Sequence, residues 1–402
     1  MGKDEWGMPL RDLGSMPTGQ ALVNLDMSDE REIRLQKMFG ITHGAKIERG
    51  KDGLSRVVQG APYPEGSLYS PFNSFREAWI AFSGDSNLDY VGKNVRATQV
   101  AGLPTAEQAL GNVCNRLLLQ DYDTDIYGWR RVVTSFTSPP DFRANERVRL
   151  NYLADLPDVL EDAPFTDPET ISDNNQSISY VVNEKGILFP FTRRVIIDDD
   201  IEFVKRVVAQ ASRAAWRTLA KRVWNLLVNN TTYGADRYAV FSAQHGNLGS
   251  APLSASALTA GRAAIFAQTE PNGPDSLALG AGPLLLVIPI QLEATALPLN
   301  HAQWLDSSYT LNPWIHRFGK EENENILVNP LCTSATNWFL FDVSGKVGII
   351  EVGFLQGAQY PQVVQSGPMQ TDAAFYQDRA VFKLRHEYEC AIIDYRGAYM
   401  ST

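Results

Sequence analysis

Residues 198–230 read DDDIEFVKRVVAQASRAAWRTLAKRVWNLLVNN, and this stretch decides the fold. Three aspartates and Glu202 stand at its start, where carboxylates can accept hydrogen bonds from free backbone N–H groups and oppose the helix dipole. Apolar or small side chains then recur every three or four residues on one face: Ile201, Val204, Val208, Ala211, Ala215, Leu219, Val223 and Leu226. The pattern predicts a single helix about 45 Å long, which we call the spine helix.

A strongly acidic segment precedes the spine helix. Residues 155–176 hold seven acidic side chains, no basic one and three prolines, so they cannot build a core by themselves. The acidic residues are Asp155, Asp158, Glu161, Asp162, Asp167, Glu169 and Asp173. Strand-like runs flank the segment at Arg147–Tyr152 and Ile178–Phe189. We expect a β-hairpin whose acidic tip is either a solvated loop or a region that contacts neighbouring subunits.

Composition is that of a folded protein with a sizeable core. The chain has 402 residues, 44% of them hydrophobic, which corresponds to about two to three domains. A net charge of −10 argues against a dedicated nucleic-acid binder, although a local basic face remains compatible with it. Cys114, Cys332 and Cys390 form no CxxC pair, so we expect reduced thiols in a cytoplasmic setting.

No membrane or export segment is predicted. The first residues carry the charges of Lys3, Asp4 and Glu5 and lack the apolar core of a signal peptide. The longest apolar run, at 283–290, is too short to span a bilayer and is typical of a buried strand. We therefore expect a soluble protein.

Shorter helices and strands surround the spine helix. Thr105 and Gln108 form a capping box, in which each side chain bonds the other residue's backbone N–H. Helices are predicted at 75–82, 105–121, after Ser254 and at 289–297. Strands are predicted at 284–288, 326–328, 338–341, 349–354 and 381–393. In the last strand Phe382, Leu384, His386, Tyr388, Cys390 and Ile392 share one face, and Lys383, Arg385, Glu387 and Glu389 share the other.

Catalytic, metal and cofactor sites are not favoured by the residue pattern. Ser242 and His245 lie three apart, which suggests a nucleophile and a base, but no GxSxG elbow accompanies them. His245 is better explained as ordering a tight turn with Gly246 and Asn247. The five histidines show no pair at the spacing of metal ligands. The glycines at 280–282 lie before a predicted strand, whereas the glycine-rich loop of a dinucleotide site lies after a strand. We expect no metal and no cofactor, and a hydrolase remains an alternative.

Several separated motifs, in order, resemble those of the phage Mu type major head subunit family, within the tailed-phage capsid fold named after phage Hong Kong 97. The junction LFPFTRR at 188–194 with IIDDD at 196–200 resembles the family's passage from extended loop to spine helix. Similar matches are FSAQHGNL at 241–248, WFLF at 338–341, IIDYRG at 392–397 and, more briefly, FREAW at 75–79 with SGD at 83–85. The resemblance covers about residues 74–402.

The resemblance implies an α+β fold of the Hong Kong 97 type with a defined order of parts. An N-terminal arm would occupy residues 1–104, and the peripheral domain would begin at 105–137. The extended loop, a β-hairpin, would occupy 138–190. The rest of the peripheral domain, with the spine helix, would occupy 191–275. An axial domain at 276–377 and a C-terminal strand at 378–402, returning to the peripheral domain, would complete the fold.

The implied function is shell assembly. Subunits would form pentamers and hexamers of an icosahedral head that encloses packaged double-stranded DNA, in the virion and, during assembly, in the host cytoplasm. Implied partners are other copies of the chain, a portal protein and a scaffold or prohead protease, with no membrane. The resemblance is also compatible with a decoration protein. A compartment shell resembling the encapsulins is the alternative within the same fold.

Three arginines of the spine helix, Arg213, Arg217 and Arg222, have two interpretations in such a shell. They would face the interior and neutralise phosphate without reading bases, or they would pair with acidic side chains of the same or neighbouring subunits. Some relatives cross-link a Lys to an Asn of another subunit. Lys185 lies near the base of the loop, but no motif identifies a partner, so we predict no cross-link.

Overall fold

The computed structural model describes residues 30–40, 46–49, 55–58, 70–88, 105–121, 127–147, 177–198, 201–271, 273–305, 310–319, 324–365 and 378–402. The chain divides into two compact units. Unit 1 comprises Met1–Thr124, Glu184–Trp216 and Ala358–Glu387, and unit 2 comprises Asp125–Asn183, Arg217–Gly357 and Tyr388–Thr402. Two long elements, α6 (Ile201–Val228) and β13 (Arg379–Ile392), contribute residues to both units.

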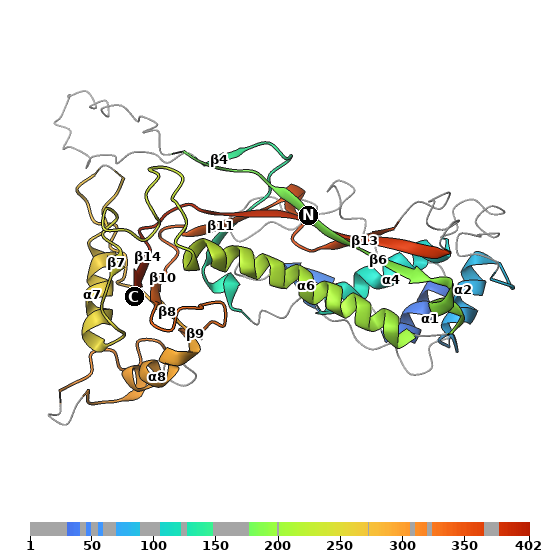
Figure 1. Ribbon diagram of the computed structural model, residues 1–402, viewed down its shortest axis with the longest axis horizontal. Helices are drawn as coiled ribbons and strands as arrows, with labels where there is room; N and C mark the ends of the chain where they lie inside the picture. The colour runs from blue at the N-terminus through green and yellow to red at the C-terminus, as the bar shows by residue number, and fades with distance from the viewer. Residues whose placement is uncertain are drawn as a thin grey trace, which may run out of the picture. The chain divides into compact units, whose positions relative to one another are not determined.

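The predicted spine helix is confirmed as α6, 28 residues long, and Figure 1 shows it as the longest helix drawn. Most of its apolar stripe is buried, with exposed fractions of 0% for Val204, Leu219 and Val223, whereas Ile201, Ala211 and Leu226 are half-buried. One boundary differs from the prediction. Asp198 ends a separate short helix, α5 (Arg193–Ile197), because its backbone N–H bonds Arg194 O at 2.8 Å, and α6 begins at Ile201.

In unit 1, helices α1 (Glu30–Phe39), α2 (Phe75–Ser83) and α4 (Ala106–Asp121) contact one another. The capping box of α4 is confirmed, since Thr105 N–H bonds Gln108 Oε1 at 2.9 Å and Gln108 N–H bonds Thr105 Oγ1 at 3.2 Å. The predicted helix at 75–82 is confirmed as α2. Within residues 1–104, expected to be an extended arm, the described parts also form α1 and a two-stranded ribbon of β1 (Lys46–Arg49) and β2 (Ser55–Val58).

The strands of unit 1 meet on the first part of β13. Strand β12 (Gln362–Gln365) pairs with it antiparallel, and β6 (Asn183–Thr192) also pairs with it. Phe189 and Phe191 of β6 pack with Phe382 of β13, with ring centroids 5.4 to 5.7 Å apart. The predicted alternation of β13 holds here, because Phe382, Leu384 and His386 are buried while Lys383 is exposed.

Unit 2 is built on a five-stranded sheet of order β7-β14-β10-β8-β9. The strands are β7 (Leu248–Gly249), β14 (Ala398–Ser401), β10 (Trp338–Asp342), β8 (Leu284–Ile288) and β9 (Ile326–Val328). Every residue of β8 and β10 is buried, because each face of the sheet adjoins a hydrophobic core. Trp338 belongs to the core that includes Leu258 of α7 (Ala255–Phe266), and Phe339 to the core that includes Trp224 of α6.

A second group of strands in unit 2 pairs on the last part of β13. Strand β11 (Ile350–Phe354) runs antiparallel to it and parallel to β3 (Val133–Thr137). The helix predicted at 289–297 forms as a 3-10 turn, Ile290–Leu292, and then α8, Glu293–His301, which continues past Pro298. Of the helices in the described part of the chain, none is both long and apolar enough to cross a membrane.

Candidate functional site

The root of the predicted β-hairpin is a short ribbon in unit 2. Strand β4 (Asn145–Arg147) pairs antiparallel with β5 (Ile178–Tyr180), with Asn145 opposite Tyr180 and Arg147 opposite Ile178. Strand pairing on either side of the acidic segment is therefore confirmed. The predicted extension at 148–152 lies outside the described residues. So do the seven acidic residues Asp155, Asp158, Glu161, Asp162, Asp167, Glu169 and Asp173.

Glu351 of β11 joins this ribbon to the sheet. It is 4% exposed, and its Oε1 accepts hydrogen bonds from Tyr180 Oη at 2.6 Å, Arg147 Nε at 2.9 Å and Thr137 Oγ1 at 3.1 Å. Its Oε2 accepts from Ser135 Oγ at 3.3 Å. A buried carboxylate is stable only when its oxygens are paired and hydrogen-bonded, and donors from β3, β4 and β5 meet that need here.

The electrostatics of this cluster follow from its burial. Burial and then the hydrogen bond to Glu351 raise the pKa of Tyr180 to about 12, so the phenol keeps its proton and donates it. The hydrogen bond to Glu351 raises the pKa of the Arg147 guanidinium above its ordinary value. Tyr180 and Arg147 therefore both keep their protons in the neutral pH range and remain donors.

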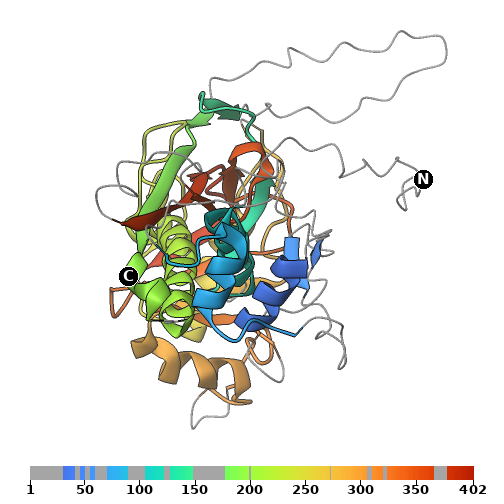
Figure 2. The ribbon, with the colours of Figure 1, turned by 90° about the vertical axis from the view of Figure 1, so that its right-hand side faces the viewer.

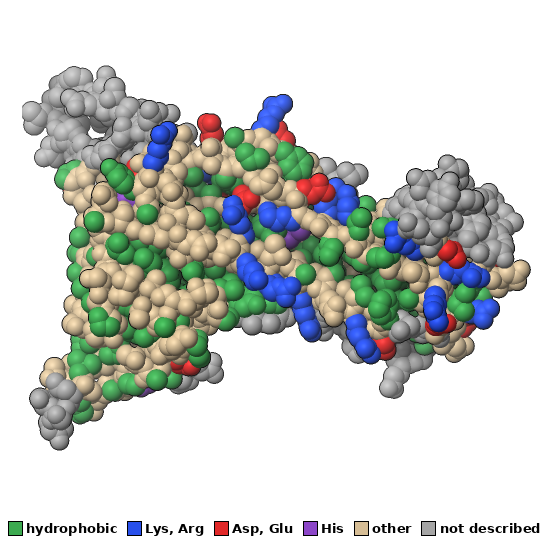
Figure 3. Space-filling model, in the orientation of Figure 1, with side chains coloured by type: hydrophobic (Ala, Val, Ile, Leu, Met, Phe, Trp, Pro, Cys, Tyr) green, Lys and Arg blue, Asp and Glu red, His purple; other side chains and the backbone are tan. Residues whose placement is uncertain are grey.

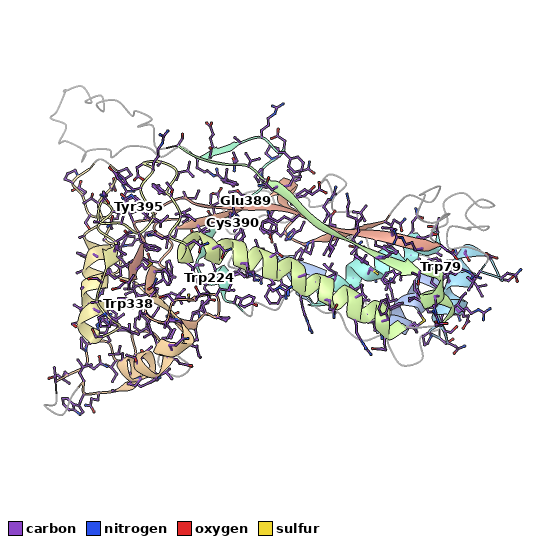
Figure 4. All side chains as sticks on the ribbon, in the orientation of Figure 1. Trp79, Trp224, Trp338, Glu389, Cys390 and Tyr395 are labelled. Carbon is purple, nitrogen blue, oxygen red and sulfur yellow. The ribbon has the colours of Figure 1, made fainter. Side chains whose placement is uncertain are left out.

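Glu389 of β13, which Figure 4 labels beside Cys390, forms a second buried carboxylate cluster. Its side chain accepts from Arg222 Nε at 2.5 Å and from Asn183 Nδ2 at 2.9 Å, and Cys390 N–H bonds the same carboxylate at 3.1 Å. The alternation of β13 predicts that Glu389 shares a face with the charged residues Lys383, Arg385 and Glu387. Unlike Lys383, Glu389 is only 6% exposed, and Arg222 of the spine helix supplies its counter-charge.

The three candidate arginines of the spine helix differ from one another. Arg222 pairs with Glu389 of its own chain, whereas Arg213 and Arg217 are exposed and form no ion pair with a described carboxylate. Arg206 and Lys221 are exposed on the same helix. In Figure 3, Lys and Arg side chains gather over α6. The structure thus separates one internally paired arginine from two available ones.

Ser242 and His245 do not form a nucleophile and base pair. Ser242 Oγ accepts from the backbone N–H of His245 at 3.3 Å, and the imidazole bonds other groups. Its Nδ1 lies 2.9 Å from Val240 O, its Nε2 lies 2.7 Å from Asp236 Oδ2, and its ring stacks on Tyr395 with centroids 3.7 Å apart. The prediction that His245 orders this turn is confirmed.

A shallow pocket of about 340 Å³ lies in unit 1, lined by Thr192, Arg193, Arg194, Ile197, Asp198 and Asp378. Each arginine has an aspartate beside it, with Arg193 Nε 3.6 Å from Asp378 Oδ2 and Arg194 Nε 3.4 Å from Asp198 Oδ2. These pairs cancel the local charge, so the pocket is not suited to hold an anion by charge alone. Among the described residues, His, Cys, Asp and Glu side chains form no group of three or more placed to bind a metal ion.

The comparison with protein families defines the class of protein. A family model described as phage capsid protein matches residues 175–401, which is more than half of the chain. The matched region begins just ahead of β5 and includes the spine helix, both buried glutamates and the final strand β14. The chain therefore belongs to the phage capsid protein family, and it is a structural component of a capsid shell.

Three solved structures are similar to the chain. A virus-like particle from Pyrococcus furiosus is 11% identical, with 72% of this chain and 98% of that one covered and a TM-score of 0.40. A Mycobacterium phage Adephagia protein is 15% identical, with 67% and 88% covered and a TM-score of 0.38. The capsid of a native GTA particle is 10% identical, with 69% and 90% covered and a TM-score of 0.43. No curated protein matches the chain. The family match carries the assignment.

The sequence did not reveal the two buried carboxylate clusters. Glu351 stands in the run IIEVGF at 349–354, which the pattern predicts to be a strand. One signal was present, since a single charge in such a run requires a buried partner. The partner residues Tyr180 and Arg147 lie about 170 and 200 positions away, and no local pattern connects them to Glu351.

Proposed function

We propose that the chain is the major head subunit of a tailed phage, of the Mu type and with the Hong Kong 97 fold. Subunits form pentamers and hexamers that close into an icosahedral shell around packaged double-stranded DNA. The observation that carries the proposal is a β-ribbon rooted on Glu351, together with the seven acidic and no basic residues at 155–176 in the segment that joins its two strands. Such a segment gains its contacts on a neighbouring subunit.

We extend the proposal to the domain order that the resemblance implies for this fold. Residues 138–190 serve as the extended loop, 191–275 as the peripheral domain with the spine helix, and 276–377 as the axial domain. Residues 1–104 act as the N-terminal arm, and 378–402 return to the peripheral domain. Head-to-tail contacts between identical subunits close into rings, which then assemble into a shell in the host cytoplasm and remain in the virion.

We propose that exposed arginines of the spine helix contact the packaged DNA. Arg213 and Arg217 lack a described carboxylate partner, so they are available to neutralise phosphate without reading bases. Arg222 is excluded from this role by its pairing with Glu389. Particles carrying Arg213→Ala should package a shorter length of DNA or lose DNA more readily at raised salt. If packaging and salt stability are unchanged, these arginines do not neutralise DNA, and contacts between subunits become their better explanation.

An encapsulin-like compartment is the second candidate in the same fold, and it differs in what the shell encloses. The test is to purify particles from the native source, treat them with nuclease and analyse their contents. Protected double-stranded DNA supports the phage head, whereas a cargo enzyme without DNA supports the compartment. A portal or terminase gene beside the coding sequence would support the phage head independently.

Other partners follow from the role of a head subunit. They are a portal protein and, during assembly, a scaffold or prohead protease; the role is also compatible with a decoration protein. We propose no covalent cross-link through Lys185. A heated, reduced denaturing gel of mature particles should therefore show the monomer, and a ladder of multimers would contradict this.

A further inference from the structure

Two histidines that are separated in the sequence meet on the surface of unit 2. His301 is the last residue of α8, which Figure 1 draws in orange, and His316 lies in the part of the chain that follows. Both residues are exposed, and their ring centroids lie 5.9 Å apart with 71° between the ring planes. The sequence indicated no ligand pair among the histidines, because these two are farther apart along the chain than the ligands of a metal-binding motif.

Asn300, which is fully buried, fixes the backbone on both sides of this pair. It precedes His301 in α8, and its backbone O accepts from His316 N–H at 2.8 Å. Its side-chain Oδ1 accepts from Phe318 N–H at 3.0 Å, and its Nδ2 donates to Gly319 O at 2.8 Å. One buried residue therefore ties the segment that carries His316 to the end of the helix that carries His301.

Asn312 fastens the same two segments a second time. This residue is 4% exposed, and its Nδ2 donates to Leu299 O at 2.6 Å and to Ala302 O at 2.8 Å. Its Oδ1 accepts from Trp314 N–H at 2.9 Å. Buried hydrogen bonds thus hold the backbone from which both imidazoles extend, which is the support that a pair of ligands needs in order to keep its geometry.

The backbone of His316 adopts a conformation that side chains rarely take. Its φ is +57°, in the left-handed region, where glycine or asparagine fits more easily. Residues in such conformations persist where their surroundings hold them, and they gather at functional sites. The hydrogen bond to Asn300 O holds this one. The turn itself does not call for an imidazole, so the side chain needs a separate explanation.

The ring nitrogens of the pair are available. Neither imidazole makes a hydrogen bond or an ion pair with a residue that the structure describes. By contrast, the ring nitrogens of His245 lie 2.9 and 2.7 Å from oxygen atoms, and the ring of His386 is buried. Among the described histidines, His301 and His316 alone combine exposure with ring nitrogens that no described residue engages.

The separation of the two rings suits a single metal ion. An imidazole nitrogen lies about 2.0 to 2.1 Å from Zn²⁺, so the centres of two rings on one ion are about 5 to 6.5 Å apart, according to the angle at the metal. The observed 5.9 Å lies within that range. Imidazole is a ligand for zinc, copper and nickel, whereas calcium and magnesium prefer oxygen ligands.

We propose that His301 and His316 form a surface site for a divalent transition-metal ion, with one ring nitrogen of each residue as a ligand and water in the remaining positions. Two protein ligands are fewer than the three or four of a resident zinc ion, so the ion exchanges and a chelator removes it. An edge-to-face contact between two metal-free rings is the alternative explanation of the geometry. The proposal does not depend on what the shell encloses.

The test is calorimetric titration of the purified full chain, carrying no histidine tag and treated with a chelator, with NiCl₂ and separately with ZnCl₂. We expect about one ion per subunit at the pair, and no comparable binding of MgCl₂. His301→Gln and His316→Asn should each weaken the binding about tenfold or more, because each removes a ligand. Asparagine is chosen at 316 because it tolerates the left-handed backbone.

His43→Gln is the matched control, since it removes a histidine and leaves the pair in place. It should bind Ni²⁺ as the wild type does. Thermal unfolding gives a second measurement, because an ion that binds the folded pair raises the Tm. Zn²⁺ should raise the Tm of the wild type and of His43→Gln, but not that of the double variant His301→Gln with His316→Asn.

Absence of Ni²⁺ and Zn²⁺ binding by the wild type would overturn the site and leave the edge-to-face contact as the explanation. Binding that is unchanged in both single variants would overturn it too, as would equal weakening in His43→Gln. Circular dichroism shows whether each variant folds. If one single variant does not fold, the other decides alone.

Discussion

Arg222 Nε and Glu389 Oε1 lie 2.5 Å apart within a single subunit. The Glu389 side chain is 8% exposed and the Arg222 side chain is 46% exposed, so a buried anion is balanced by a cation that reaches it from the surface of the spine helix. This pairing distinguishes Arg222 from Arg213 and Arg217, whose positions on the same helix look equivalent in the sequence. It also gives the helix a specific polar contact with β13.

Arg222→Ala should destabilise the subunit by about 2 kcal/mol, because it leaves a buried carboxylate with fewer partners. The figure is below that for a fully buried pair, since Arg222 is partly exposed and Asn183 and Cys390 N–H still bond Glu389. Arg213→Ala, on the exposed part of the same helix, should change stability by less than about 0.5 kcal/mol. Chemical unfolding of both variants measures the difference, and equal effects would refute the internal pairing.

His386 should make the subunit less stable in mild acid. Burial lowers the pKa of His386 to about 3, partly offset by the hydrogen bond from Nε2 to Gln359 O, against 6.5 for an ordinary histidine. Below about pH 6.5 the unfolded chain binds a proton that the folded chain does not, so stability falls by up to about 1.4 kcal/mol per pH unit. Above that pH the contribution is constant.

The measurement compares the free energy of unfolding of the wild type and His386→Leu between about pH 7 and pH 5. Leucine fills the apolar site without titrating, so the wild type should lose stability more steeply on acidification. Parallel pH profiles for the two proteins would show that His386 is not buried as a neutral ring.

The cysteines should not react in the folded subunit. Burial raises the pKa of both Cys114 and Cys332 to about 12, and Cys390 is buried at 3% exposure. Thiolate is the reactive form, so labelling by a thiol reagent should be slow at neutral pH and complete after denaturation. Mass spectrometry counts the labels. Rapid labelling of the native subunit at any of the three would contradict this burial.

Asn247 should matter more to stability than Ser242, the residue considered above as a nucleophile. Its Nδ2 donates to Val240 O at 3.0 Å and to Ala398 O at 3.2 Å, and its Oδ1 accepts from Ser242 N–H at 3.1 Å. Asn247→Ala removes all three bonds, leaving Val240 O with only its contact to His245 Nδ1, and should cost about 3 kcal/mol. Ser242→Ala serves as the control and should cost about 1 kcal/mol, with no hydrolytic activity to lose. Equal costs, or an esterase activity abolished by Ser242→Ala, would refute the assignment.

Local signals in the sequence were sufficient to predict the helices and strands but not the two buried carboxylate clusters of Glu351 and Glu389. The capping box of Thr105 and Gln108, the cap at Ser254 and the stripe of the spine helix act over a few residues, and each formed as predicted. The alternation of β13 groups Glu389 with Lys383, Arg385 and Glu387 but does not reveal its burial. Alternation describes a strand with one wet face, whereas this part of β13 is buried on both faces.

Contacts distant in sequence explain what could not be predicted. Glu351, Tyr180 and Arg147 come together only because β3, β11 and the ribbon are brought side by side by the fold. The function class was readable because ordered motifs carry family information that single residues lack. The distinction among the three arginines required coordinates, since their spacing along the helix gave no hint that only Arg222 meets a carboxylate.

Assembly is the central claim, and direct imaging tests it first. The purified chain is examined by negative-stain electron microscopy together with light scattering at several protein concentrations. We predict closed particles or capsomer rings whose abundance rises with concentration, because identical subunits with head-to-tail contacts close into rings and shells. A monomer that stays monomeric at every concentration and salt condition would contradict the account.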